Sequence, residues 1–108
     1  MRRAARIDAN HGEIVAALRA IGAEVTSLAA VGAGVPDLLA SYRGDWHVIE
    51  VKSPAGPRGG DSAAGQRLRE TQRAWISRQR ARVHVVRSVS DALEAVGAAR
   101  KCTQEPRS

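Results

Sequence analysis

The sequence has few of the residues that cross-link small proteins or anchor them in membranes. Its one cysteine, Cys102, excludes an internal disulfide framework and a zinc site built from several cysteines. No apolar run approaches the roughly 20 residues that a membrane-spanning helix needs. The basic residues 1–6 are not followed by the apolar segment of a secretory signal. We therefore expect an intracellular, cytoplasmic protein that does not bind membranes.

Aromatic residues and lysines are also scarce. Phenylalanine is absent, and the aromatic residues are Tyr42, Trp46 and Trp75. Aliphatic side chains and alanines must therefore fill the core, which suits helices packed closely on a sheet. Arginine is the default base, because Lys52 and Lys101 are the only lysines among 17 basic residues. A lysine in an apolar segment, as at position 52, therefore calls for a functional explanation.

Size and charge set the scale of the molecule and suggest a class of partner. The chain has 108 residues, of which 44% are hydrophobic and 26% charged, as expected for one globular domain. We assign residues 1–97 to that domain and 98–108 to a polar C-terminal tail. A net charge of +6 favours polyanions, and nucleic acid is the commonest of these. A basic surface without a particular partner is the alternative that charge alone leaves open.

The pattern of apolar residues and glycines predicts an α/β fold. We predict, in order, a helix from Asp8 or Asn10 to residue 21, strands at 23–28, 35–42 and 45–53, a helix at 70–79, a strand ending at Val89 and a short helix capped by Ser90. Residues 53–67, rich in proline and glycine, are predicted to be a mobile basic loop. Both faces of the two central strands carry apolar residues, so we expect a mixed sheet with helices covering both faces.

The turn between the two central strands determines which side chains meet. If Arg43 and Gly44 form a two-residue hairpin loop, Asp37 lies directly opposite Glu50. Lys52, two residues beyond Glu50, points to the same face. A one-residue slip would put the two carboxylates on opposite faces, so this prediction depends on the turn.

These charged residues predict a metal site. Two carboxylates roughly 5 Å apart repel one another unless a cation lies between them. Mg²⁺ prefers such oxygen ligands, with Mn²⁺ as its expected substitute. Lys52 would orient or deprotonate an attacking water and stabilise the transition state, so that the site could hydrolyse a phosphodiester. The alternative is a plain salt bridge between Glu50 and Lys52 at the end of a strand.

Four short motifs occur in order within residues 8–96. They are Asn10-His11-Gly12-Glu13, Gly34-Val35-Pro36-Asp37, Glu50-Val51-Lys52, and the segment 68–75 with Gln72 and Trp75. In this order and spacing they resemble the PD-(D/E)xK nuclease superfamily, and in particular its VRR-NUC family, which is related to the Holliday-junction resolvases. The resemblance implies a restriction-endonuclease-like core, with a mixed sheet flanked by helices.

The resemblance also implies a function and a set of site residues. Members are metal-dependent endonucleases that hydrolyse DNA, and small members act on branched or junction DNA as homodimers. Asp37, Glu50 and the carbonyl of Val51 would bind Mg²⁺, and Lys52 would serve the water and the transition state. Gln72 would orient the site from the second helix, and Glu13 would complete it as a further catalytic residue and ligand.

Basic residues are concentrated near the proposed site. Seven arginines lie between positions 58 and 82, against two acidic residues. We expect Arg58, Arg67, Arg69 and Arg73 to contact the DNA backbone. Arg69 also stands where the family often has a threonine, which predicts a weaker cap for the second helix. Two other functions stay open: a non-catalytic nucleic-acid-binding module, and a nuclease subunit active only within a larger phage or repair assembly.

Overall fold

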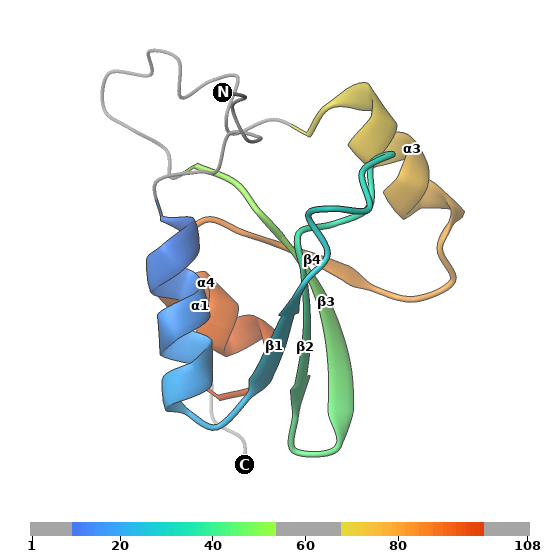
Figure 1. Cartoon of the computed structure of the whole chain (residues 1–108). Coiled ribbons are helices and arrows are strands. Elements are labelled where there is room, and N and C mark those ends of the chain that lie inside the picture. Colours follow the sequence, from blue (N-terminus) through green and yellow to red (C-terminus); the bar gives the residue numbers. More distant parts are fainter. Residues whose placement is uncertain (1–9, 54–67, 99–108) are drawn as a thin grey trace, which may run out of the picture.

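The computed structural model describes residues 10–53 and 68–98, which form a mixed four-stranded sheet with helices packed against it (Figure 1). The elements are α1 (His11–Ala20), β1 (Glu24–Ser27), β2 (Leu38–Tyr42), β3 (Asp45–Val51), α3 (Glu70–Arg78), β4 (Val83–Val86) and α4 (Val89–Ala95). The strands lie in the order β1-β2-β3-β4; the first three are antiparallel, and β4 is parallel to β3. The α/β class and the order of the elements agree with the prediction.

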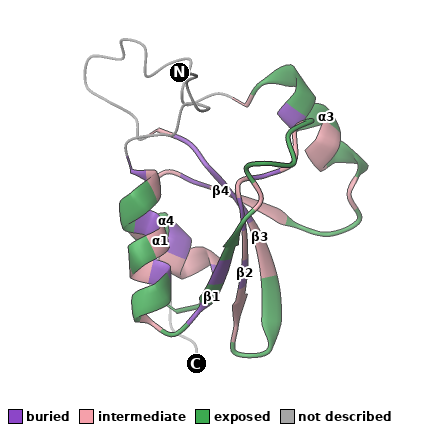
Figure 2. Ribbon diagram, in the orientation of Figure 1, coloured by how far each residue is buried: buried purple, intermediate pink, exposed green. Residues whose placement is uncertain are grey.

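One face of the sheet carries the hydrophobic core. Helices α1 and α4 pack on each other and on this face, and buried residues gather between them and the strands (Figure 2). In α1 the buried residues Ile14 and Leu18 are four apart and share one side of the helix. The buried residues of this core are aliphatic in the described part of the chain, as the shortage of aromatic residues predicts, and the half-buried Tyr42 packs against them. The buried members of the core are Ile14, Leu18, Ala23, Val25, Leu38, Ala40, Ile49, Val51, Val86, Ala92 and Val96.

The other face of the sheet is covered less completely than we expected. Helix α3, nine residues long, lies on the side away from α1 and α4 and near one end of the strands (Figure 1), where Gln72 contacts Glu50. Trp46 is 71% exposed, and its neighbours on the same face, Leu39 and Val48, are half-buried. The prediction that helices cover both faces is therefore correct only in part for the described residues, because α3 contacts this face at one end of the strands, at Glu50.

The hairpin between β2 and β3 has the predicted register. Arg43 and Gly44 both have positive φ, 52° and 88°, as a two-residue hairpin turn of the primed type requires. Tyr42 pairs with Asp45, and Leu38 pairs with Ile49 at the other end of the ladder. The same register, continued by one residue, sets Asp37 opposite Glu50.

Several predicted boundaries differ from the structure: β1 is one residue shorter at each end than the predicted strand 23–28, and β3 ends at Val51 rather than at residue 53. Two larger differences have local reasons. The strand predicted from residue 35 begins only at Leu38, because Pro36 has no N–H to donate to a ladder. The last strand ends at Val86 rather than Val89, and Ser88 replaces Ser90 as the cap of α4. The Ser88 hydroxyl accepts a hydrogen bond from the Asp91 N–H at 3.0 Å.

The sequence did carry a signal for this second correction. A serine followed three residues later by an acidic residue is typical of a helix start, and here Asp91 accepts a 2.9 Å hydrogen bond from the Arg87 N–H. The predicted loop at 53–67 and the tail at 98–108 lie outside the described residues, apart from Ser53 and Ala98. None of the helices in the described ranges combines the length and the apolar character needed to cross a bilayer.

Candidate functional site

Two charged side chains are buried together at the end of β3. Glu50 and Lys52 point to the same face of the strand and are only 2% and 7% exposed. The Lys52 Nζ lies 3.6 Å from Oε2 of Glu50. Residues of these types are almost never fully buried without a partner. The pair lies on the face opposite the aliphatic core, where α3 packs.

Asp37 lies beside this pair, at the start of β2. Its Oδ2 accepts a 2.9 Å hydrogen bond from the backbone N–H of Val51. Its own carbonyl accepts a 2.7 Å bond from the N–H of Leu28, which follows β1. The half-buried Asp37 is thus held from both neighbouring strands. Its carboxylate gives the Val51 N–H an acceptor in place of a backbone carbonyl.

The backbone geometry also indicates where the carbonyl of Val51 points. The N–H of Lys52 donates to the Val86 carbonyl of β4 at 2.9 Å. In a strand, the N–H and carbonyl of one residue point to one neighbouring strand, and those of the next residue point to the other. The N–H and carbonyl of Val51 therefore point away from β4. The N–H on that side is bound by Asp37, and the carbonyl therefore lies on the same side of β3 as the Asp37 carboxylate.

Gln72 connects α3 to the site. Its Nε2 donates a 2.7 Å hydrogen bond to Oε2 of Glu50, and its Oε1 accepts a 2.8 Å bond from the backbone N–H of Arg69. The Gln72 side chain is 6% exposed. Arg69 has no side-chain acceptor with which to cap the helix, and its side chain makes no cap hydrogen bond. Gln72 satisfies the backbone at the helix start from within the helix, which offsets the weak cap that we predicted.

Gly34 brings the loop before Asp37 into contact with the first turn of α3. A Cβ at this position would overlap the carbonyl oxygen of Thr71, the residue before Gln72. Gly34 also has a φ of +84°, which side chains rarely allow. The loop that leads to Asp37 and the helix that carries Gln72 are therefore packed backbone to backbone.

Burial and charge act together on Glu50. Burial raises the pKa of its carboxyl group to about 7, and repulsion from the Asp37 carboxylate adds to the rise. The ammonium of Lys52 and, more weakly, the guanidinium of Arg69 oppose that rise in the pKa. A cation bound between the carboxylates would relieve their repulsion. Two carboxylates and a carbonyl make an all-oxygen donor set, which fits Mg²⁺.

The remaining predicted residues are not all brought to this site. Glu13 is exposed in the first turn of α1, away from the buried side of that helix. Within residues 10–53 and 68–98, no three His, Cys, Asp or Glu side chains are grouped so that they could share a metal ion. A role for Glu13 alongside Asp37 and Glu50 therefore stays a prediction without support from this geometry.

The predicted DNA-contacting arginines fall into two groups. Arg69 and Arg73 are exposed at the start of α3, next to Gln72. The Arg73 guanidinium, which has five N–H donors, uses one of them on the Leu68 carbonyl at 3.3 Å. Arg58 and Arg67 lie outside the described residues.

The sequence did not point to one buried polar residue at this end of the sheet. Asn10 is only 6% exposed and stands at the N-cap position of α1, where its side chain makes no cap hydrogen bond. Its Nδ2 instead donates to the carbonyls of Lys52 and Arg87, at 3.2 and 2.9 Å. An asparagine before a helix is ordinarily expected to cap it, so nothing in the sequence indicated these partners.

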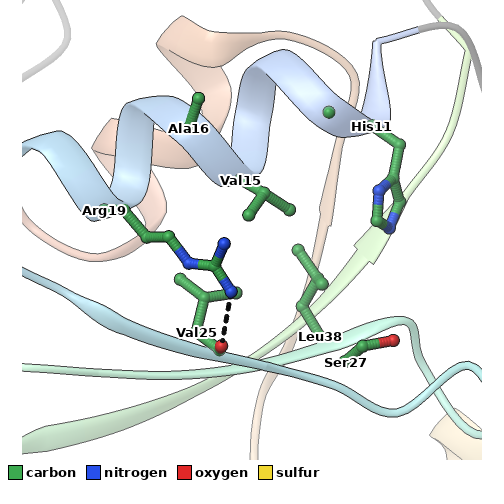
Figure 3. A pocket seen from close by; sticks show the side chains of 8 residues that line it. His11, Val15, Ala16, Arg19, Val25, Ser27 and Leu38 are labelled. Carbon is green, nitrogen blue, oxygen red and sulfur yellow. Dashed lines mark hydrogen bonds between the residues drawn. The ribbon is translucent and has the colours of Figure 1, made fainter.

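A hollow of about 390 Å³ lies between α1 and β1 (Figure 3). Its lining is mostly apolar, with Val15 and Leu38 among it, and the Arg19 guanidinium reaches across to donate to the Val25 carbonyl at 3.2 Å. Leu38 faces away from Asp37 and Glu50, so this hollow is on the other face of the sheet and is separate from the acidic site.

Comparison of the chain with protein-family models, with curated proteins and with solved structures found no match. Membership of the VRR-NUC family stays a prediction from the four motifs, and the function has to be argued from the geometry of Asp37, Glu50, Lys52 and Gln72.

Proposed function

We propose that the protein is a metal-dependent DNA endonuclease whose active site is built from Asp37, Glu50 and Lys52. One observation carries the proposal: Glu50 is buried against Lys52 and Gln72, with the Asp37 carboxylate close enough to raise its pKa. We include in the proposal that the sheet and helices form a restriction-endonuclease-like core.

A structural salt bridge accounts for less of this arrangement. It would explain why Lys52 lies 3.6 Å from Glu50, and the Val51 N–H gives one oxygen of Asp37 a partner, but neither contact offsets the repulsion between the two carboxylates. Burying charges costs several kcal/mol per ion, and an added like charge increases that cost. Groups with strongly shifted pKa values and specific charged partners are concentrated at functional sites. The arrangement of these charges is better suited to binding a cation than to stabilising the fold.

The site residues fit Mg²⁺ and its usual substitute Mn²⁺. When bound by Asp37, Glu50 and the Val51 carbonyl, the metal would polarise the phosphate and acidify a water molecule. Among the described residues, the hydrogen bond from Gln72 and the contact from Lys52 both fall on Oε2 of Glu50, so Oε1 is the oxygen that we assign to the metal. Gln72 thus fixes the orientation of the carboxylate without occupying both of its oxygens.

Lys52 would supply a positive charge next to the reacting phosphate. Its ammonium, held next to Glu50, would donate to the attacking water or to a phosphate oxygen. Negative charge builds up on that phosphate in the transition state, and a fixed cation stabilises it most strongly in a site shielded from water. At 7% exposure Lys52 is in such a place.

DNA is the substrate that the charge distribution favours. The net charge of +6 attracts a polyanion, and Arg69 and Arg73 are exposed beside the site on α3. Arginines at a helix start suit contact with the phosphate backbone rather than base reading. The preference for branched DNA and the homodimer follow from the family resemblance, and light scattering at micromolar concentration tests the dimer directly.

The experiment is a cleavage assay with labelled four-way junction, flap, single-stranded and linear duplex DNA, in Mg²⁺, Mn²⁺ or EDTA. We expect metal-dependent cleavage by the wild type, strongest on the branched substrates, and a rate about 10³-fold lower in Lys52→Ala. Arg43→Asn, which removes a charge at the exposed hairpin tip and suits the positive φ of this turn residue, is the control and should cleave normally. Binding without cleavage in every metal, equal for the wild type and Lys52→Ala, would contradict the proposal in favour of a non-catalytic module.

A further inference from the structure

The parallel strands β3 and β4 end side by side, and two backbone carbonyls face the start of α1. These are the carbonyls of Lys52 and Arg87, and Nδ2 of Asn10 donates to both, at 3.2 and 2.9 Å. An amide NH₂ group has two hydrogens, so a single asparagine can supply both donors. Asn10 therefore links the first helix to the ends of both strands.

The Asn10 amide has one orientation that fits its surroundings. If the amide were turned over, its oxygen would face two carbonyl oxygens, so the nitrogen must point toward the strands. Within the described residues, Oδ1 is then buried and makes no hydrogen bond. Leaving a buried acceptor unpaired is unfavourable, and the side chain is also not capping α1. The two hydrogen bonds to the strand ends are therefore what explains why Asn10 is buried.

Lys52 depends on this link because it lies just beyond the end of β3 at Val51. Its N–H is bound by the Val86 carbonyl and its own carbonyl by Asn10. The two bonds hold the peptide groups on both sides of the Lys52 Cα. Without Asn10, the peptide group after the Lys52 Cα would lose this restraint, and the direction in which the side chain leaves the backbone toward Glu50 would be less closely fixed.

We infer that Asn10 is a positioning residue for Lys52, an inference that rests on the function proposed above for this site. Asn10 does not contact the carboxylates, and it would touch neither metal nor substrate. It acts through the backbone of Lys52, from an element 42 residues away in the sequence. Misplacing a catalytic group by about 1 Å is enough to slow an enzyme roughly 100-fold.

Kinetics on the preferred DNA substrate separates positioning from plain stability. We expect Asn10→Ala to lower kcat about 10- to 100-fold while KM stays within about twofold. Adding Asn10→Ala to Lys52→Ala should cause no further loss, because the group that Asn10 positions is already gone. Ile14→Val, buried one turn later in α1, controls for destabilisation and should leave kcat unchanged. Equal losses of kcat in the Lys52 and Lys52→Ala backgrounds would overturn the inference.

A second measurement does not depend on cleavage. Lys52 and Lys101 are the only lysines, so labelling the lysine ε-carbons with ¹³C gives two NMR signals, with Lys101 as the internal reference. In Asn10→Ala we expect the Lys52 signal to move toward that of a free lysine and to sharpen. Asn10→Ser, which keeps one donor and is the fallback if the alanine variant does not fold, should give a smaller shift.

The two possible failures are distinguishable. A wild type that cleaves no DNA in any metal would refute the proposed function, whereas the NMR experiment would still report on the contact between Asn10 and Lys52. An unchanged Lys52 signal in a folded Asn10→Ala or Asn10→Ser protein would overturn the inference even if the wild type proves to be a nuclease.

Discussion

Gln72 of α3 donates a 2.7 Å hydrogen bond to Glu50 of β3, and both side chains are almost fully excluded from solvent. The bond connects the helix on the more open face of the sheet to the charged pair at the strand end. The same amide accepts from the Arg69 N–H, so it stabilises the start of α3 as well. One side chain thus couples the position of the helix to the orientation of a carboxylate.

Replacing Gln72 should therefore affect both stability and activity. Gln72→Ala removes a buried hydrogen bond to a charged acceptor, so we expect the free energy of unfolding to fall by about 1.5–3 kcal/mol. Cleavage should fall too, because Glu50 loses its fixed orientation. Urea unfolding and the cleavage rate measure the two effects. Gln79→Ala, which removes only a bond to the Trp75 carbonyl at the other end of α3, should have a clearly smaller effect on both; equal effects would contradict this account.

Glu50 makes the stability of the metal-free protein depend on pH. Its pKa rises from the ordinary 4.5 to about 7 on folding, so the folded state binds more protons between these values. The stability present below pH 4.5 is lost as the pH rises through 7, by up to about 3 kcal/mol. Glu50→Gln keeps an acceptor for Gln72 but cannot ionise. In EDTA, this variant should be more stable than the wild type at about pH 8, with little gain at about pH 4.5.

The same pair of proteins tests whether Glu50 binds metal. Mg²⁺ should raise the Tm of the wild type at about pH 8, because a ligand that binds only the folded state stabilises it. It should leave the Tm of Glu50→Gln nearly unchanged. A gain in stability for Glu50→Gln that is the same at both pH values, or an equal Mg²⁺ effect on both proteins, would contradict the role given to this carboxylate.

Much of the fold and the centre of the site could be predicted from the sequence, because local turn chemistry determines them. Arg43 and Gly44 fix the hairpin, and the hairpin fixes which side chains share a face. Asp37, Glu50 and Lys52 follow from that register alone. The order of helices and strands follows from apolar periodicity in the same way.

What could not be predicted depends on contacts between distant segments. The partners of Asn10 lie at the ends of strands far along the chain, and an asparagine before a helix ordinarily predicts a cap. How far the face of the sheet opposite the core is covered depends on where α3 packs. The contacts of Gln72 with Glu50 and of Gly34 with Thr71 fix that position. The exposure of Trp46 could not be foreseen for that reason.

The close approach at Gly34 predicts a destabilising substitution. Gly34→Ala would push a methyl group into the Thr71 carbonyl and would also strain a residue with φ of +84°. We expect a loss of more than about 2 kcal/mol in the free energy of unfolding, with reduced cleavage, because α3 must move away from Glu50. Gly32→Ala is the matched control, since Gly32 has a similar φ of +71° but open space around it. Urea unfolding of both variants separates the clash from the strain, and equal losses would argue against the contact.

The exposed arginines of α3 should affect DNA binding through salt-dependent contacts. If Arg73 contacts one phosphate, Arg73→Ala should weaken binding to all DNA sequences alike and reduce the salt slope of log K by about 1. We expect the same for Arg69→Ala. Fluorescence anisotropy at several salt concentrations, with Lys52→Ala as the background to slow cleavage, measures both slopes. Arg43→Asn, which removes a charge but keeps the turn, should leave the slope unchanged; an unchanged slope in Arg73→Ala as well would remove α3 from the DNA-binding surface.

The most direct test of the account is single-turnover cleavage of the preferred DNA by the wild type and by Asp37→Asn, in Mg²⁺ and in EDTA. Asparagine can still accept the hydrogen bond from the Val51 N–H, so the substitution removes the charge while retaining the contact that holds the start of β2. We predict a loss of about 10³-fold in the Mg²⁺-dependent rate, with unfolding stability largely retained. A variant that cleaves at the wild-type rate in Mg²⁺ would contradict the claim that Asp37 and Glu50 form a catalytic metal site.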